Sequence, residues 1–151
     1  MRAAAPKLLS LLFTAFALVP AGAHLMELAN KIDVPAESYL TMQQIYRGWS
    51  LSAILVLGAL LSTLWLVLTL RRQRGGIAAL VAFVSIVGTQ IVFWIFTFPM
   101  NAATNDWTML PAGWEAMRAQ WEYSHAASAG LNIVALVSTI VAVLRSSSSS
   151  S

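Results

Sequence analysis

The sequence contains no cysteine and few charged residues. The absence of cysteine excludes disulfides, thiolate metal sites, cysteine nucleophiles and iron–sulfur clusters. Charged side chains make up 10% of the 151 residues, hydrophobic side chains make up 58%, and the mean hydropathy is +0.72. A soluble domain has about 25% charged residues. The composition therefore predicts an integral membrane protein.

Four long apolar segments occur, at about 8–28, 49–70, 77–98 and 125–144. Each is close to the ~20 residues that a helix needs to cross a hydrocarbon core about 30 Å thick. Helices satisfy their own backbone hydrogen bonds in lipid, and the segments lack the alternation of barrel strands. We therefore expect one all-α domain over residues 1–145, an up-down bundle of four transmembrane helices in a lipid bilayer. Residues 146–151 are a low-complexity serine tail to which we assign no role.

The net charge of +3 is not arranged as a stripe that would fit phosphate backbones, so no nucleic-acid partner is expected. Basic residues instead lie before the first segment, between the second and third, and after the fourth: Arg2, Lys7, Arg71, Arg72, Arg74 and Arg145. Positive charge accumulates on the cytoplasmic side of membrane proteins. We predict a multi-pass protein of the inner (cytoplasmic) membrane with both termini in the cytoplasm.

The N-terminal 23 residues resemble a cleavable signal peptide, with a basic start, an apolar run and the triplet Ala21-Gly22-Ala23. Cleavage would make His24 the N-terminal residue, where its amine and imidazole together would chelate copper. We favour an uncleaved first span because the apolar character continues through Leu28. Pro20 is then expected to kink that span.

Two pairs of titratable residues stand out, His24 with Glu27 and Glu122 with His125. A spacing of three residues places both members of a pair on one helix face. The first span runs outward and the fourth runs inward, so the two pairs have mirrored order. The first and last helices of an up-down bundle are neighbours. We therefore predict one cluster at the outer face, with both histidines deeper and both glutamates nearer the water.

Such a cluster suits two kinds of chemistry. His24, His125, Glu27 and Glu122 could hold one divalent transition metal, iron, copper or zinc, because imidazole and carboxylate are ligands for these ions. Without a metal, the same four residues could act as catalytic acids and bases or as a proton relay. The alternative is that they only form hydrogen bonds that tie helix ends together. Di-iron bundles use glutamates from two further helices, which this sequence lacks at that depth, so one ion is favoured over two.

Polar and aromatic residues near this cluster predict a substrate pocket lined by Trp49, Trp94, Asn101, Trp107 and Trp121. Trp and Tyr also anchor proteins at membrane interfaces, which is the alternative for most of them. Arg47 either pairs with a carboxylate of the cluster or reaches lipid headgroups. Gln90, inside the third span, is expected to form a hydrogen bond within the bundle.

The connections carry their own signals. Pro35 and Glu37 predict a helix start in the first outer connection, and the glycines of residues 71–76 (RRQRGG) predict a tight turn. Pro99 is expected to end the third span. Residues 111–123 have alternating aromatic and charged stripes that predict a short interfacial helix leading into the fourth span. The small residues 126–130 would allow a neighbouring helix to approach closely.

Four outer segments, AHLMEL, YLTMQQIYRGW, FPMNAATNDW and WEAMRAQWEYSHA, carry a family resemblance. With Asn101, Trp114, Trp121 and His125, the chain resembles a family of small four-span bacterial membrane proteins, a domain of unknown function that includes the anthrone oxygenases. The resemblance implies an oxygenase-like membrane bundle that acts on polycyclic phenolic substrates. It does not assign a role to His24 or Glu27.

The sequence thus favours an oxygenase or oxidoreductase for a lipophilic aromatic or quinone-like small molecule that arrives from the bilayer. The alternative is a non-enzymatic membrane subunit whose His and Glu pairs are only structural. In that case the small residues of the fourth span would pack against another membrane protein, or against a second copy of this chain.

Overall fold

The structure is a computed structural model that describes residues 4–147. Four helical segments are long and apolar enough to cross a membrane. The first is α1 (Ala4–Lys31) and the last is α6 (Trp114–Ser147); between them, α3 (Ala53–Leu70) follows the 3₁₀ turn η2 (Trp49–Ser52), and α4 (Gly76–Val92) begins the third. The residues that the structure describes contain no strand. The predicted all-α membrane bundle is confirmed.

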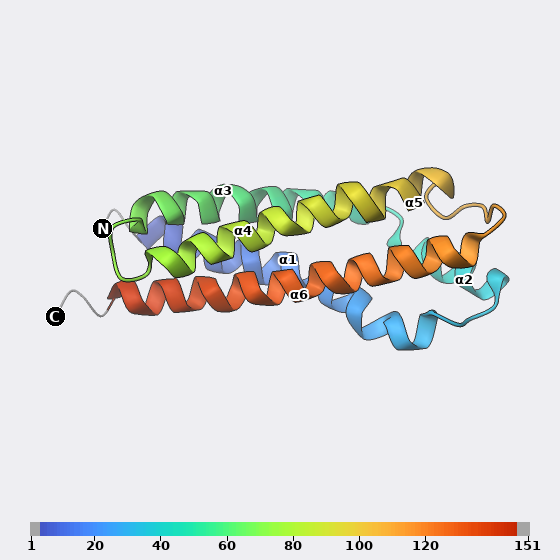
Figure 1. Cartoon of the computed structure of the whole chain (residues 1–151), viewed down its shortest axis with the longest axis horizontal. Coiled ribbons are helices and arrows are strands. Elements are labelled where there is room, and N and C mark those ends of the chain that lie inside the picture. Colours follow the sequence, from blue (N-terminus) through green and yellow to red (C-terminus); the bar gives the residue numbers. More distant parts are fainter. Residues whose placement is uncertain (1–3, 148–151) are drawn as a thin grey trace.

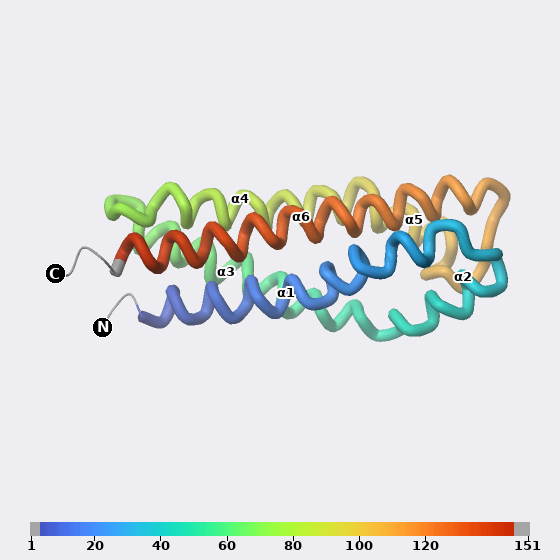
Figure 2. The backbone as a smooth tube through the Cα atoms, turned by 90° about the horizontal axis from the view of Figure 1, so that it is seen from below, coloured from blue at the N-terminus to red at the C-terminus, as the bar shows by residue number. Residues whose placement is uncertain are grey.

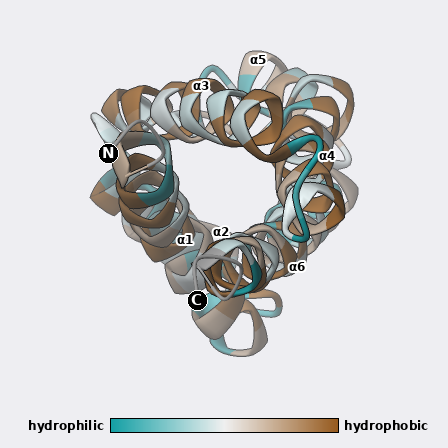
Figure 3. Cartoon of the chain, turned by 90° about the vertical axis from the view of Figure 1, so that its left-hand side faces the viewer, coloured by the Kyte–Doolittle hydropathy of each residue, from teal (hydrophilic) through white to brown (hydrophobic). Residues whose placement is uncertain are grey.

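The four long segments lie side by side and alternate in direction (Figure 1). Seen along the bundle, α1 packs against α3 and α6, and α4 completes the ring between α3 and α6 (Figure 3). The first and last spans are therefore neighbours, as predicted. The start of α1, the end of α6 and the turn after α3 share one end of the bundle (Figure 2). The short helices α2 (Ala36–Gln43) and α5 (Phe98–Ala103) lie at the other, which we call the α2–α5 end.

Small residues form the centre of the bundle. Ala17, Ala59, Ile86 and Ala135, one from each long helix, make one buried cluster. Because alanine has only a methyl group, the helices can approach closely, which is how membrane helices gain packing energy without a hydrophobic driving force. Many large apolar side chains are instead exposed on the outside, where lipid would surround them, and Figure 3 shows that hydrophobic residues occur along all four long helices.

The turn between α3 and α4 needs its glycines for close approach. A Cβ on Gly75 would collide with the backbone carbonyl oxygen of Ala142 in α6, and one on Gly76 would lie 2.6 Å from the carbonyl oxygen of Leu70. Real Cβ atoms do not come that close. The predicted tight reversal is present, and the glycines also allow α6 to pack against it.

Pro99 does not end the third span, contrary to the sequence-based expectation. The helix continues from α4 through a π-helical segment, η3 (Phe93–Thr97), into α5. Proline lacks the N–H that a helix interior requires. The N–H of Phe98 reaches the carbonyl oxygen of Phe93, five residues back, so the wider turn fits the helix around Pro99.

The predicted interfacial helix before the fourth span is also not separate. Residues 114–147 form one continuous helix, α6, and only residues 111–113 precede it. Arg118 and Glu122 of the supposed polar stripe are 9% and 1% exposed because the segment around α2 covers them. Pro35 and Glu37 do begin α2 as predicted.

Candidate functional site

A cavity of about 790 Å³ lies inside the α2–α5 end of the bundle. All four long segments contribute to its wall, together with the residues between α2 and α3 and the loop after α5. Small and apolar side chains such as Ala17, Val56 and Leu60 line its inner part. The side chains that give it chemical character are His24, Gln43, Asn101, Trp107, Trp121 and His125. The volume is in the range that holds drug-sized molecules.

His24 and His125 face each other across the contact between α1 and α6. Their rings are stacked, with centroids 4.1 Å apart and planes inclined by 23°. His24 Nδ1 and His125 Nε2 are buried and have no hydrogen-bond partner among the described residues. Two imidazolium ions at such a distance would repel by about 4 kcal/mol at an effective dielectric constant of 20. The geometry therefore suits a pair in which no more than one imidazole is positively charged.

Aromatic rings surround the histidines. The ring of His24 lies 4.4 Å from Tyr46, 5.5 Å from Trp49 and 5.1 Å from Trp121 between centroids. Trp121 also meets His125 at 4.2 Å in an edge arrangement. Rings at these distances and tilts pack favourably and limit the rotamers of the imidazoles.

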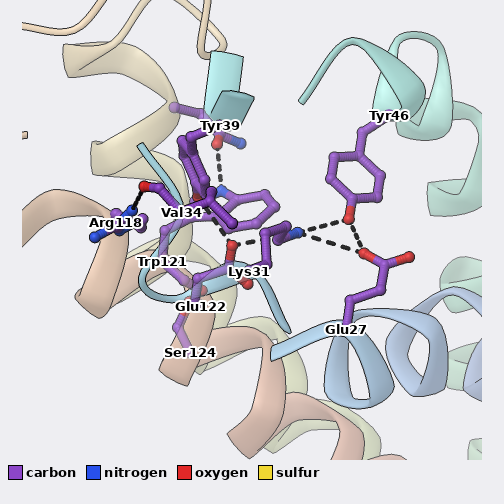
Figure 4. A network of polar contacts seen from close by, with 10 residues as sticks. Glu27, Lys31, Val34, Tyr39, Tyr46, Arg118, Trp121, Glu122 and Ser124 are labelled. Atoms are coloured by element: carbon purple, nitrogen blue, oxygen red, sulfur yellow. Dashed lines mark hydrogen bonds and ion pairs between the residues drawn. The ribbon is translucent and has the colours of Figure 1, made fainter. Parts of the chain in front are cut away.

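The two glutamates meet a lysine rather than the histidines. Lys31 Nζ lies 3.4 Å from Glu27 Oε2 and 3.2 Å from Glu122 Oε1, and it donates a 2.6 Å hydrogen bond to the hydroxyl of Tyr46. Tyr46 in turn donates to Glu27 (Figure 4). The Lys31 side chain is only 4% exposed. A buried ammonium is stable only when charges and hydrogen bonds compensate for lost water, and this network supplies both.

Tyr39, from α2, covers the carboxylate of Glu122. It is fully buried, and its hydroxyl donates a 2.9 Å hydrogen bond to Glu122 Oε1. Burial raises the pKa of Tyr39, and the nearby Glu122 carboxylate raises it further. Burial and then the hydrogen bond with Glu27 likewise raise the pKa of Tyr46. Both phenols therefore keep their protons at neutral pH and act as donors.

The predicted four-residue cluster thus falls into two adjoining groups. The histidines stack on the cavity wall, while Glu27 and Glu122 enclose Lys31. Within residues 4–147, no group of three or more His, Cys, Asp and Glu side chains is placed so that it could hold a metal ion. Both glutamates were predicted to lie nearer the water than the histidines. The Glu27 side chain is 43% exposed, in line with this, but that of Glu122 is 0% exposed beneath Tyr39 and Lys31.

Most of the predicted pocket residues line the cavity. Trp49, Asn101, Trp107 and Trp121 all belong to its wall, and Trp121 Nε1 donates a 2.6 Å hydrogen bond to Asn101 Oδ1. Trp94 does not face the same way: it is 59% exposed and packs with Phe93 and Phe98 on the outside of the bundle. It is placed as expected for a lipid-facing anchor.

Arg47 and Gln90 have local partners. Arg47 Nη2 donates to Gln44 Oε1 at 2.9 Å, so the carboxylate pairing considered for it is not formed. Gln90 donates to the hydroxyl of the preceding Thr89 at 3.2 Å, a hydrogen bond within its own helix, and both residues line the cavity.

Buried polar atoms without partners concentrate at this cavity. Six such side-chain atoms occur in the described part of the chain, and four of them belong to residues of the cavity wall: His24, Gln43, Trp107 and His125. Proteins pair the large majority of their buried polar groups. Residues of this one cavity wall therefore account for most of the unsatisfied hydrogen-bonding capacity in the described part of the chain.

The residues predicted from the sequence for this site did not include Lys31. Two signals could have identified it. Lys31 follows Glu27 by four residues, which places both on one helix face, and it ends the helix that carries His24. Its contact with Glu122 depends on the packing of α1 against α6, which local spacing does not encode.

Comparisons of the chain with family models, with curated proteins and with solved structures find no match.

Proposed function

We propose that this protein is a membrane oxygenase that oxidises a flat, lipid-soluble phenolic or quinone-like molecule in the cavity. The observation that carries the proposal is the stacked pair of His24 and His125 on the wall of a cavity that aromatic rings also line, with His24 Nδ1 and His125 Nε2 unpartnered among the described residues. Aromatic walls favour a flat ring system. Two adjacent imidazoles can accept a proton from it and pass it on.

An anthrone illustrates the chemistry, in keeping with the family that the outer segments resemble. A neutral imidazole removes a proton from the acidic CH₂ group and leaves an aromatic oxyanion. Dioxygen, which dissolves readily in lipid, then oxidises that anion. One anthrone and one O₂ give one anthraquinone and one water, so no further oxidant is required.

In this proposal the α2–α5 end faces the outer side of the inner membrane and both chain termini are cytoplasmic. Arg71, Arg72 and Arg74 support this orientation because they are exposed at the opposite end of the bundle. Leu57 is 56% exposed on the outside of α3 and also belongs to the cavity wall. We therefore expect a substrate dissolved in the bilayer to enter beside Leu57.

The test uses purified protein in lipid nanodiscs with anthrone as the probe. We expect wild-type protein to consume O₂ and form anthraquinone in equal amounts. His24→Ala and His125→Ala should each lower the rate by about 100-fold or more, the usual contribution of a positioned base. Thr69→Ala is the matched control, because that exposed hydroxyl bonds only to the carbonyl of Trp65 in its own helix.

Metal analysis of the same samples separates the two roles considered for the histidines. If wild-type protein holds stoichiometric iron, copper or zinc and both alanine variants lose it, the histidines act as metal ligands rather than as bases. Absence of anthrone binding and of O₂ uptake by wild-type protein would contradict the proposal. The non-enzymatic alternative would then gain weight, because Gly130 on α6 is exposed with open space around its Cα and leaves room for another membrane helix.

A further inference from the structure

Two hydrogen-bond donors in the cavity have no part in the proton chemistry proposed above. Trp107 is 2% exposed and Gln43 is 5% exposed, and both line the cavity at the α2–α5 end. Trp107 Nε1 and Gln43 Nε2 are buried and have no hydrogen-bond partner among the described residues. Trp121, which packs with Trp107 and Tyr39 in one buried hydrophobic cluster, differs because its Nε1 is paired with Asn101.

The backbone holds the Trp107 ring in a defined position. Asn105, Asp106 and Trp107 have φ angles of 50°, 53° and 59°, three successive non-glycine residues in the left-handed region. Residues other than glycine rarely adopt that region because of steric clashes, so surrounding contacts must hold the segment there. The backbone N–H of Trp107 donates to the Thr104 hydroxyl at 3.1 Å, and the indole ring packs edge-on against Tyr39 and Trp121.

The chemical type of the missing partner follows from the indole. The indole N–H of tryptophan is a donor and never an acceptor, and the amide nitrogen of Gln43 also only donates. We propose that Trp107 and Gln43 form an acceptor-binding subsite that receives a carbonyl or phenolate oxygen of the ligand. This inference rests on the proposed function and specifies its substrate class.

The distance to the histidines adds a constraint on the ligand. The Trp107 ring is 5.7 Å from the Trp121 ring, and Trp121 is 4.2 Å from His125. A flat ligand that lies along Trp121 would reach the subsite at one edge and the histidines at the other. The oxygen acceptor and the carbon that loses its proton should therefore lie on opposite sides of the ring system, as the carbonyl and CH₂ groups of an anthrone do.

The experiment compares two probes of nearly equal shape, anthraquinone with its carbonyl oxygens and anthracene with none. Binding to the full chain in nanodiscs is measured by equilibrium partition, with the ligand's own absorbance as the readout. Wild-type protein should prefer anthraquinone. Trp107→Phe should weaken anthraquinone binding by about three- to tenfold, the effect of one lost hydrogen bond, and should leave anthracene binding unchanged. Gln43→Met should act in the same direction.

Trp65→Phe is the matched control, since it makes the same change at a tryptophan that is 46% exposed on α3 and is not among the residues that line the cavity, and it should not alter the ratio of the two affinities. Equal losses for both probes in Trp107→Phe, or no loss for either, would overturn the subsite even if anthrone turnover by wild-type protein supports the proposed function. Loss of preference for anthraquinone in Trp107→Phe supports the subsite even if no O₂ is consumed. Failure of wild-type protein to bind either probe overturns both proposals.

Discussion

Among single residues, Lys31 has the largest structural role that the sequence did not reveal. Its ammonium lies between two carboxylates and beneath the rings of Tyr46 and Trp121, at 4.4 and 5.1 Å from their centroids. It joins α1, α6 and the segment after α2 at one point. The same contacts keep Glu27 and Glu122 engaged beside the histidines.

Replacing Lys31 by methionine should therefore destabilise the protein strongly. The change leaves the fully buried Glu122 without its cation, and breaking a buried ion pair by removing one partner costs about 3–5 kcal/mol. We expect a clearly lower midpoint in thermal unfolding of the detergent-solubilised protein. The double variant Lys31→Met, Glu122→Gln should recover part of the loss, because it removes the unpaired charge. If the single and double variants unfold alike, Lys31 and Glu122 are not coupled.

At the scale of secondary-structure elements, contacts outside an element decided where it ends. Pro99 is a local signal for a helix end, yet the third span continues through it because η3 accommodates the missing N–H. Thr97 in η3 and Ser124 in α6 lie 2.7 Å apart and hydrogen-bond across the two helices. This contact between helices helps to hold the π-helical segment in place.

The turn from α3 to α4 provides a test at this scale. Gly75→Ala should destabilise the bundle by roughly 1–3 kcal/mol, the usual effect of overpacking, because the new methyl group would meet the backbone of Ala142. Gly130→Ala is the control: it lies inside α6 with nothing near its Cβ position, so the higher helix propensity of alanine should make it neutral or slightly stabilising. Thermal unfolding of both variants measures the difference. Equal midpoints would show that the turn can move away from α6.

For the whole molecule, the up-down arrangement of the four spans determines which residues of different helices can come into contact. Because α1 and α6 are antiparallel neighbours, His24 and His125 reach the same level and stack. The basic turn after α3 lies at the opposite end from α2 and α5. The two ends therefore differ in charge, which is the basis of the proposed orientation.

The absence of cysteine makes that orientation directly testable. Ser38 in α2 and Gln73 in the turn after α3 are both exposed and lie at opposite ends. In intact bacterial spheroplasts, a membrane-impermeant maleimide should label Ser38→Cys at once and Gln73→Cys only after permeabilisation. The cysteine-free parent protein is the blank. The reverse labelling pattern would place the cavity on the cytoplasmic side.

The sequence alone determined the properties that depend on composition and local order. Long apolar runs predicted four helices because lipid cannot hydrate a free backbone, and the turn glycines predicted antiparallel neighbours. The pairing of His24 with His125 also followed, from the mirrored order of two short motifs. Asn101, Trp107 and Trp121 were assigned to the pocket from their place near the ends of the spans.

Tertiary structure decided which side chains touch. Lys31 lies on the same face of α1 as Glu27, and the rotation of α1 against α6 brings it to Glu122 as well. Neither helix's spacing encodes that rotation. The packing of α2 over α6 buries Glu122 and Arg118, which a helical wheel assigned to a polar face. Trp94 and Trp107 are both tryptophans near a span end, yet one points outward and the other into the cavity. The two side chains stand on different backbones: Trp94 lies on the outer face of the π-helical segment η3, whereas Trp107 lies in a left-handed turn after α5.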